Sequence, residues 1–315
     1  MIPVVGGEPA VEPFAHPALF YRGPEDYLSG TLAFIRAGLA QDEPVAVSVP
    51  TTNLALIREA LGSDAGAVRL LDMTIEGRNP GRIIPGILRA FADVYPQGRV
   101  RIIGEPVWAA RSELEYPACA QHEGLIDAAF AGRAVTILCP YDLTTLSPAI
   151  VADAYATHRK VIDRDGEITS GTYDPASVVA AYNRQLGQPP ATARTFAFDV
   201  DTLSHARWAV VDYATGRGMS ESRLVDLEVV IGEAIANSVV HGGGRGTLSY
   251  WLEDAQICCQ IHDSGHILDP LSGRLPAALR TAGGRGLLLI NQLATLVRMH
   301  TDSAGTTLRV HVPLH

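Results

Sequence analysis

Two polar residues, four positions apart, interrupt an otherwise apolar helical pattern in the second half of the chain. The stretch EVVIGEAIANSVVHGGG, residues 228–244, predicts the end of a long helix, and it places Glu233 and Asn237 one turn apart on the same side. A carboxylate there can take a proton from a hydroxyl or a water. An amide oxygen is a ligand that suits Mg²⁺. The pair indicates a reactive site, and the alternative is a solvated Glu with an Asn near a helix end.

The other residues of this helix define two faces. The core face is predicted to hold Leu224, Leu227, Ile231, Ala234 and Ile235. The side of Glu233 and Asn237 is predicted to carry Val229, Val230 and Val240 as well. A half-apolar surround of this kind favours a site over an ordinary solvated surface.

A predicted strand that ends in HDSG offers groups for a purine base. The carboxylate of Asp263 can accept a hydrogen bond from the exocyclic amine of adenine, and Gly265 lets a base approach the backbone. In the last predicted strand, the segment GTT provides the hydroxyls of Thr306 and Thr307 on the base side.

A glycine cluster between these two strands offers a place for phosphate. In GGRGLLLI, Gly283, Gly284 and Gly286 come directly before a predicted helix. The free amide groups of a helix start attract anions, so this segment predicts a phosphate-binding loop.

The four elements ExxxN, DxG, GxG and GTT, in this order, strongly resemble the GHKL ATPase family, which includes the histidine kinases and gyrase B. The resemblance covers about residues 194–313 and implies ATP and Mg²⁺ as ligands. It implies that Glu233 is the general base and Asn237 the Mg²⁺ ligand. The ATP-binding set that it implies is Asn237, Asp263, Gly265, Gly284, Gly286, Thr306 and Thr307. One departure is DSGHI, where His266 and Ile267 stand in place of the usual second glycine.

The short segment between Asp263 and Gly284 resembles the anti-sigma-factor serine kinase branch of this family. That resemblance implies a serine/threonine kinase that binds a sigma factor and phosphorylates a serine of an antagonist protein, with Glu233 activating the hydroxyl. Two alternatives stay open. One is a non-catalytic, ATP-binding anti-sigma or partner-switching protein. The other is an atypical sensor histidine kinase, for which His158 in THRKVI is the helical candidate near the domain boundary.

The elements around these motifs predict a two-layer α+β sandwich of the GHKL, or Bergerat, type. Helices are expected over 202–218, 220–242 and 283–295. Strands are expected over 194–201, 246–254, 255–265, 296–302 and 305–314. Antiparallel strands with helices on one face give this architecture.

The first half of the chain alternates between helical and strand patterns, which predicts βαβ units and a parallel α/β sheet. Helices are expected over 24–41, 53–62, 80–95, 118–132 and 148–162. Strands are expected over 44–50, 67–73, 99–108 and 134–140. The segment VSVPTTNLALIREAL has neither the glycines nor the lysine of GxxxxGK[ST], so this half is not expected to bind ATP through a P-loop.

The segments GRNPGRI, IIGEPVW, QHEGLIDAAF and CPYD resemble the MEDS sensory domain of bacterial regulators, over about residues 14–162. The resemblance implies a RecA-like α/β fold and an unknown small molecule as ligand. It implies seven candidate pocket residues: His16, Glu105, Trp108, His122, Glu123, Tyr141 and Asp142. His122 and Glu123 could instead be a surface pair. No His, Cys, Asp or Glu pair in this half has zinc-like spacing, so no metal is expected there.

Residues 163–193 break the pattern and predict a linker between domains at 14–162 and 194–315. Within it, Asp174 and Pro175 predict the cap and first turn of a short helix.

Composition limits the class of protein. The 315 residues are 47% hydrophobic with a net charge of −9, so we expect a folded chain that does not bind nucleic acid directly. No apolar run has the length of a membrane span, and the N-terminus lacks the pattern of a signal peptide. The sequence therefore predicts a cytoplasmic protein with reduced cysteines, and a homodimer is possible.

Overall fold

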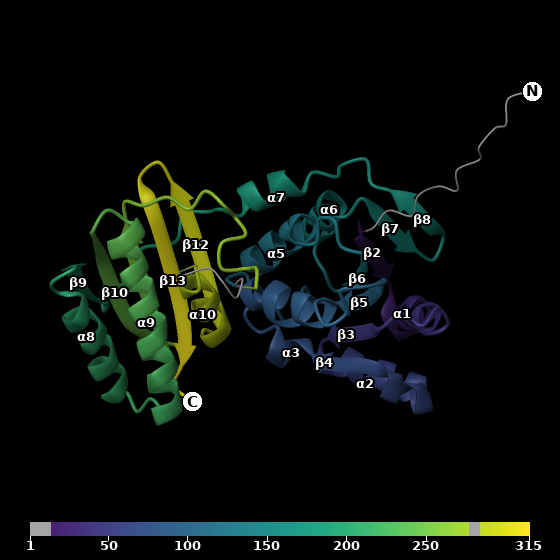
Figure 1. The fold of residues 1–315 in the computed structure, drawn as a ribbon, viewed down its shortest axis with the longest axis horizontal. Helices are drawn as coiled ribbons and strands as arrows, with labels where there is room; N and C mark the ends of the chain where they lie inside the picture. The colour runs from purple at the N-terminus through teal and green to yellow at the C-terminus, as the bar shows by residue number, and fades with distance from the viewer. Residues whose placement is uncertain (1–13, 277–283) are drawn as a thin grey trace, which may run out of the picture.

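The computed structural model describes residues 14–276 and 284–315, so Gly283 of the predicted phosphate loop lies outside the described residues. Two separate sheets, one in each half of the chain, stand side by side, and the connecting segment passes along one edge of both (Figure 1). Among the described residues, no helix combines the length and the apolarity that crossing a membrane requires.

The N-terminal sheet is parallel except at one edge. Its strand order is β4-β3-β5-β6-β2-β7-β8, with β1 beside β6, and only the β7–β8 pair is antiparallel. The strands are β1 (Phe14–Ala15), β2 (Pro17–Tyr21), β3 (Val45–Val49), β4 (Val68–Asp72), β5 (Val100–Gly104), β6 (Val135–Asp142), β7 (Lys160–Asp163) and β8 (Gly166–Thr169). Every residue of β2 and β3 is buried, as expected for parallel strands that are covered on both faces.

Helices cover both faces of this sheet, and a separate apolar cluster lies on each side. One cluster packs Ile35 and Ile57 against Val47, and the other packs Ile126 against Ile102. The helical elements are α1 (Gly23–Leu39), α2 (Thr51–Leu61), η1 (Gly62–Ala67), α3 (Met73–Glu76), η2 (Pro80–Arg82), η3 (Ile84–Arg89), α4 (Ala90–Ala92), α5 (Tyr116–Ala129) and α6 (Pro148–Thr157). The predicted parallel α/β architecture is confirmed.

Two predicted helices of this half were wrong in extent. The helix expected over 80–95 is divided into η2, η3 and α4, and Pro85 within it lacks the backbone donor of a regular helix. The helix expected over 148–162 ends at Thr157, because His158 turns to an extended conformation and its Nδ1 bonds the carbonyl of Ala154 at 2.9 Å. The residues that follow form β7, and β8 lies inside the expected linker.

The rest of the connecting segment carries the predicted short helix, α7 (Pro175–Ala181). The backbone N–H of Ser177 donates to Asp174 Oδ1 at 3.1 Å, so the predicted cap is confirmed. Helix α7 packs tightly on α5, because a methyl group on Gly124 would lie 2.9 Å from the carbonyl oxygen of Pro175. Helix α7 of the connector therefore packs against the N-terminal half.

The C-terminal half is the predicted two-layer sandwich. Its antiparallel sheet has the order β12-β13-β11-β10-β9, and α8, α9 and α10 share one apolar core with it. The elements are β9 (Arg194–Asp199), α8 (Leu203–Thr215), α9 (Glu221–His241), β10 (Arg245–Glu253), β11 (Gln256–Asp263), α10 (Gly286–Leu293), β12 (Leu296–Asp302) and β13 (Gly305–Pro313).

Helix α9 buries the predicted core face, with Leu227, Ile231 and Ile235 fully enclosed. Val230 was assigned to the opposite side and is also fully enclosed. It lies three residues after Leu227 and four before Ala234, so it belongs to the core face. Val240 is 71% exposed, so the side of Glu233 is less apolar than the sequence predicted.

Candidate functional site

A cavity of about 450 Å³ lies among α9, the end of β11, the start of α10 and β13. Six of the eight residues predicted for ATP line it: Asn237, Asp263, Gly265, Gly284, Gly286 and Thr306. Glu233 and Thr307 are not part of the wall.

Gly286 opens α10 directly against the polar turn of α9. A methyl group on Gly286 would lie 2.7 Å from Oε2 of Glu233 and 2.9 Å from Nδ2 of Asn237, which is too close for a real side chain. Glycine therefore lets the start of α10 reach both polar side chains. This places a half-buried carboxylate, an amide and the free N–H groups of a helix start at one edge of the cavity.

Asp263 is held in a fixed orientation inside the cavity. The hydroxyl of Ser238 donates to its Oδ2 at 2.5 Å, and the backbone N–H of Gly265 donates to its Oδ1 at 2.8 Å. Ser238 is buried and lines the cavity. The sequence analysis did not include Ser238. Its position directly after Asn237 on the same helix was the available signal.

The two threonines of GTT point to opposite faces of β13. Thr306 is buried, lines the cavity and donates to the carbonyl of Gly265 at 2.8 Å. Thr307 lies 3.1 Å from Nδ1 of His262, on the other face. Because side chains alternate along a strand, only Thr306 is placed to reach a ligand. The predicted role for Thr307 is therefore not supported by its position.

Glu105, in the N-terminal half, is buried directly after β5 in a set of hydrogen bonds. It accepts from the hydroxyls of Tyr21 at 3.1 Å and Tyr27 at 3.2 Å, and from the amide of Asn53 at 3.0 Å. Burial raises the pKa of Glu105 to about 7, against the lowering effect of these donors. The carboxyl group is thus satisfied by the protein itself.

Three more of the sensor candidates have separate surroundings. The guanidinium of Arg111 lies 3.9 Å from the ring centre of Trp108. Asp142 closes a turn by accepting from the backbone N–H of Thr144 at 2.9 Å. His122 is buried, and burial lowers its pKa to about 3. The alternative of a surface pair formed by His122 and Glu123 was wrong, because both are buried.

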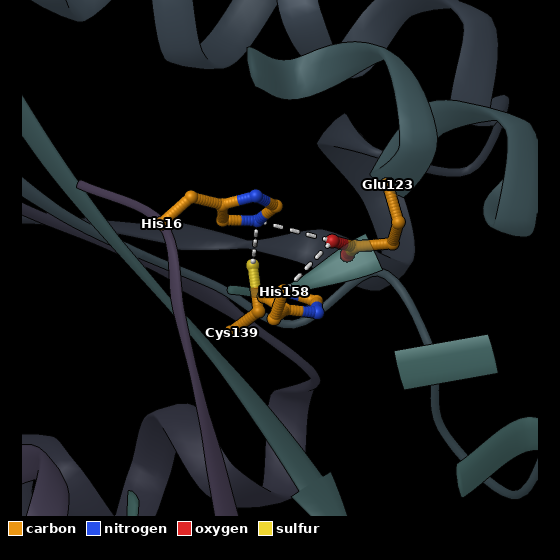
Figure 2. Close-up of side chains that lie close together, drawn as sticks. All are labelled: His16, Glu123, Cys139 and His158. Carbon is orange, nitrogen blue, oxygen red and sulfur yellow. Dashed lines mark hydrogen bonds and ion pairs between the residues drawn. The ribbon is translucent and has the colours of Figure 1, made fainter. Parts of the chain in front are cut away.

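Only His16 and Glu123 of the seven candidates meet directly, with His16 Nε2 and Glu123 Oε2 3.3 Å apart. Cys139 and His158 join them, so four potential metal ligands come together in this half (Figure 2). The absence of zinc-like spacing was therefore a poor guide to the geometry. His158 is fully enclosed, which does not suit a phosphoacceptor that must meet a kinase domain.

The cavity that borders this region is small. Glu123 and Tyr141 are the sensor candidates in its wall, and its volume is about 10 Å³, close to the space of one water. Two of the seven predicted pocket residues therefore share this small cavity.

Comparison with known families gives one match in each half. Residues 15–159 match the methanogen/methylotroph DcmR sensory domain, MEDS, and residues 196–312 match the histidine kinase-like ATPase domain. The chain joins a MEDS domain to a histidine kinase-like ATPase domain. Both resemblances predicted from the sequence are confirmed.

Similar proteins include a serine-protein kinase. The chain is 28% identical to the serine-protein kinase RsbW of Halalkalibacterium halodurans over 131 residues, which is 38% of this chain and 81% of the relative. The RsbU and RsbW domains of Rv1364c from Mycobacterium tuberculosis are 17% identical, over 40% of this chain and 33% of that one, with a TM-score of 0.30. The match thus spans a third of that structure. The SiaB–SiaC complex from Pseudomonas aeruginosa is 14% identical, over 37% and 88% of the chains, with a TM-score of 0.30.

The MEDS domain touches the ATPase domain at the helix that lines the cavity. Asn79, fully buried before η2, donates from Nδ2 to the carbonyl of Asn291 at 2.8 Å. A methyl group on Gly81 would lie 2.1 Å from Oδ1 of Asn291. Asn291 lies near the end of α10, and Gly286 at the start of α10 lines the cavity. One short helix therefore joins the domain contact to the candidate ATP site.

A second contact runs through the connector. Asn183, shortly after α7, donates to the carbonyl of Thr301 at 2.8 Å and accepts from its N–H at 3.0 Å. The hydroxyl of Thr301 in turn lies 3.0 Å from that of Thr306, in the cavity wall. The contact of Asn79 and the contact of Asn183 thus each involve an element that also lines the cavity of the candidate site.

Proposed function

We propose that this protein is a cytoplasmic partner-switching regulator, in which the ATPase domain phosphorylates a serine or threonine of an antagonist protein. The observation that carries the proposal is the convergence of Glu233 and Asn237 on Gly286 at the edge of the 450 Å³ cavity. The similarity to a serine-protein kinase supports the class of phosphoacceptor. A sigma factor is the second partner that this branch of the family implies.

The cavity suits ATP with Mg²⁺. Its volume of about 450 Å³ is within the range of small-molecule sites. Asp263, oriented by Ser238 and Gly265, offers an acceptor for the exocyclic amine of adenine. Gly284 has open space beside it, and Gly286 lets the start of α10 approach Glu233 and Asn237 closely. Backbone N–H groups at this helix start can meet phosphate oxygens.

Asn237 would hold Mg²⁺ through its amide oxygen, and the ion would supply positive charge to the phosphates. Glu233 lies beside it and is half-buried, so a hydroxyl that enters at this edge of the cavity meets a carboxylate. In this proposal Glu233 takes the proton of the acceptor hydroxyl, and Asn237 would hold the ion beside it.

We also propose that residues 14–162 control this activity, with residues 163–193 as connector and 194–315 as the kinase. The buried contact between Asn79 and Asn291 supports this, because α10 carries the contact at one end and lines the cavity at the other. A ligand that changes the position of η2 would bias the start of α10, provided that it binds the two positions unequally.

The test is phosphate transfer by the full chain. The purified protein is incubated with ATP labelled in the γ-phosphate and with native lysate as the source of acceptors. Labelled bands are then tested for stability in acid and in alkali. The proposal expects an acid-stable, alkali-labile product typical of phosphoserine or phosphothreonine.

Two variants identify the residue responsible. Glu233→Gln should abolish transfer and keep ATP binding, because the amide has the same shape but takes no proton. Glu228→Gln is the matched control, since Glu228 is on the same helix and pairs with Arg207 at 3.7 Å on the surface. ATP binding without any transfer by the unmodified protein would favour a non-catalytic switch. An acid-labile product would favour a histidine kinase.

A further inference from the structure

Four polar side chains from four different elements meet inside the MEDS domain. They are His16 between β1 and β2, Glu123 on α5, Cys139 on β6 and His158 after α6 (Figure 2). All four are buried, and one potential ligand atom from each lies within 4.8 Å of the others. Nothing in the proposed kinase activity uses this cluster.

Three distances inside the cluster match those between the ligands of a tetrahedral ion. His16 Nε2 lies 3.3 Å from Cys139 Sγ and 3.3 Å from Glu123 Oε2. His158 Nε2 also lies 3.3 Å from Glu123 Oε2. Ligands at about 2.0–2.3 Å from a tetrahedral Zn²⁺ are separated by about 3.3–3.8 Å.

Two of these three close contacts, those to Glu123, are not hydrogen bonds. Among the described residues, neither carboxylate oxygen of Glu123 nor Nε2 of His158 has a hydrogen-bond partner. Buried polar atoms almost always have one, so three such atoms in one cluster require an explanation. An ion between them would satisfy the two atoms that face each other, Glu123 Oε2 and His158 Nε2.

The outer contacts of both histidines prepare them as ligands. Nδ1 of His16 lies 3.0 Å from a carboxylate oxygen of Asp127, and Nδ1 of His158 lies 2.9 Å from the carbonyl of Ala154. Both partners accept hydrogen bonds, so each Nδ1 carries a proton and each Nε2 faces the inside of the cluster. Histidine ligands of metals are usually fixed in this way.

We propose that this cluster is a four-coordinate site for a transition-metal ion, Zn²⁺ or a metal of similar softness. Two imidazoles, a thiolate and a carboxylate form a donor set that suits Zn²⁺, and hard ions such as Mg²⁺ prefer oxygen alone. One thiolate and one carboxylate neutralise the two positive charges, which favours burial of the ion. Among residues 14–276 and 284–315 the group has four members and all of them are buried, as in closed structural or sensory sites.

The site also touches the connector. Asp127, the outer partner of His16, accepts a hydrogen bond from the hydroxyl of Tyr173, which precedes α7. The metal would therefore fix β2, α5 and β6 together at the point where the chain leaves the MEDS domain. This inference does not depend on kinase activity, because its test measures metal directly.

The first experiment measures metal in the full chain. The protein is produced with added zinc, freed of loosely bound metal by gel filtration and analysed by mass spectrometry for metals. One zinc per chain is expected. A sample produced with cobalt should show the visible bands of four-coordinate Co²⁺ and a near-ultraviolet thiolate-to-cobalt band. Neither readout requires a mutation, so a variant that fails to fold leaves the test intact.

Variants then assign the ligands. Cys139→Ser should remove the thiolate band and stoichiometric zinc, and His158→Gln should lose stoichiometric zinc. Cys119→Ser is the matched control, since Cys119 is also a fully buried thiol of this half and lies outside the cluster. Asp127→Asn should weaken zinc affinity about 10–100-fold, measured by competition with a chromophoric chelator. If the unmodified chain holds no more zinc than Cys139→Ser, the cluster is a buried ion pair of His16 and Glu123, and the proposal is overturned.

Discussion

The contact between the two domains allows a quantitative test of communication, through Asn79→Ala. The Nδ2 group of Asn79 donates to the carbonyl of Asn291 at 2.8 Å, and its Oδ1 accepts from the N–H of Gly81 at 3.1 Å. Asn291 is in the last turn of α10, where carbonyls have no partner within the helix. The substitution therefore leaves a buried acceptor without its donor and removes the cap of η2.

The expected cost follows from these two losses. A buried acceptor left without a partner costs about 1–3 kcal/mol, and a lost cap costs about 1 kcal/mol. Docking of η2 on α10 should weaken by about 2–4 kcal/mol in total. The coupling to ATP cannot exceed that amount, and a typical coupling of 1–3 kcal/mol corresponds to about 5–150-fold in affinity. We expect weaker ATP binding, because the contact fixes the helix whose start lines the cavity.

The assay is calorimetric titration of the full chain with ATP and Mg²⁺, together with thermal unfolding. Gly81→Ala is a second perturbation of the same contact, since its methyl group would lie 2.1 Å from Oδ1 of Asn291. Gly66→Ala is the matched control in the same half, because a methyl group there meets nothing within 4 Å. If thermal unfolding shows that the domain contact is weakened but the ATP affinity stays within twofold, α10 does not couple the MEDS domain to ATP binding. If unfolding is unchanged, the assigned energy of the contact is wrong.

Three further predictions concern single positions. Asp263→Asn should weaken ATP binding roughly 10–150-fold in calorimetry, because it removes a charged acceptor worth about 1.5–3 kcal/mol. The exposed Asp254→Asn is its control, and equal ATP affinity in the two variants would refute the adenine contact. Gly286→Ala should weaken ATP binding with the fold retained by circular dichroism, because its methyl group would lie 2.7 Å from Glu233 Oε2, and unchanged binding would place ATP elsewhere. For Glu105, burial raises the pKa from 4.5 to about 7, so its stabilising contribution is full below the unfolded pKa and is lost as pH rises through 7. Glu105→Gln should reduce the change in the free energy of unfolding between pH 5 and 8 by up to roughly 3 kcal/mol, measured by denaturant unfolding at each pH. The exposed Glu113→Gln should follow the unmodified protein.

Much of the fold could be predicted because local patterns determine it. Strands such as β3, with five buried residues in a row, indicate a covered parallel sheet, and the period of α9 indicates its core face. Local rules failed where a side chain competed with the backbone. At Thr157 and His158 the side chains bond the carbonyls of the last helical turn, and the chain leaves the helix earlier than its apolar pattern predicts.

Six of the residues that line the cavity could be predicted from the sequence because their motifs are short and ordered along the chain. The motif DSG predicts a role for the carboxylate of Asp263. It does not predict its hydrogen-bond partner Ser238, because a serine on a buried helix face has many possible roles. The choice between Thr306 and Thr307 required the register of β13, in which Thr306 pairs with Asp263 and Thr307 with His262. Sequence spacing alone offers both hydroxyls, and the alternation along a strand selects one.

The histidine and cysteine cluster could not be predicted from spacing, because the order of strands in the sheet creates it. β2 lies between β6 and β7, so Ala18 pairs with Cys139 on one side and Pro17 with Lys160 on the other. His16, directly before β2, is thereby close to Cys139 and to His158, although more than a hundred residues separate it from each along the chain. Helix α5 supplies Glu123 to the same cluster. Metal motifs with short spacing arise within one turn or hairpin, whereas a parallel sheet brings together ligands from strands that are distant in sequence. A metal site in a domain of this class has to be sought in the strand order, and the measured zinc content of the chain decides whether that reasoning holds here.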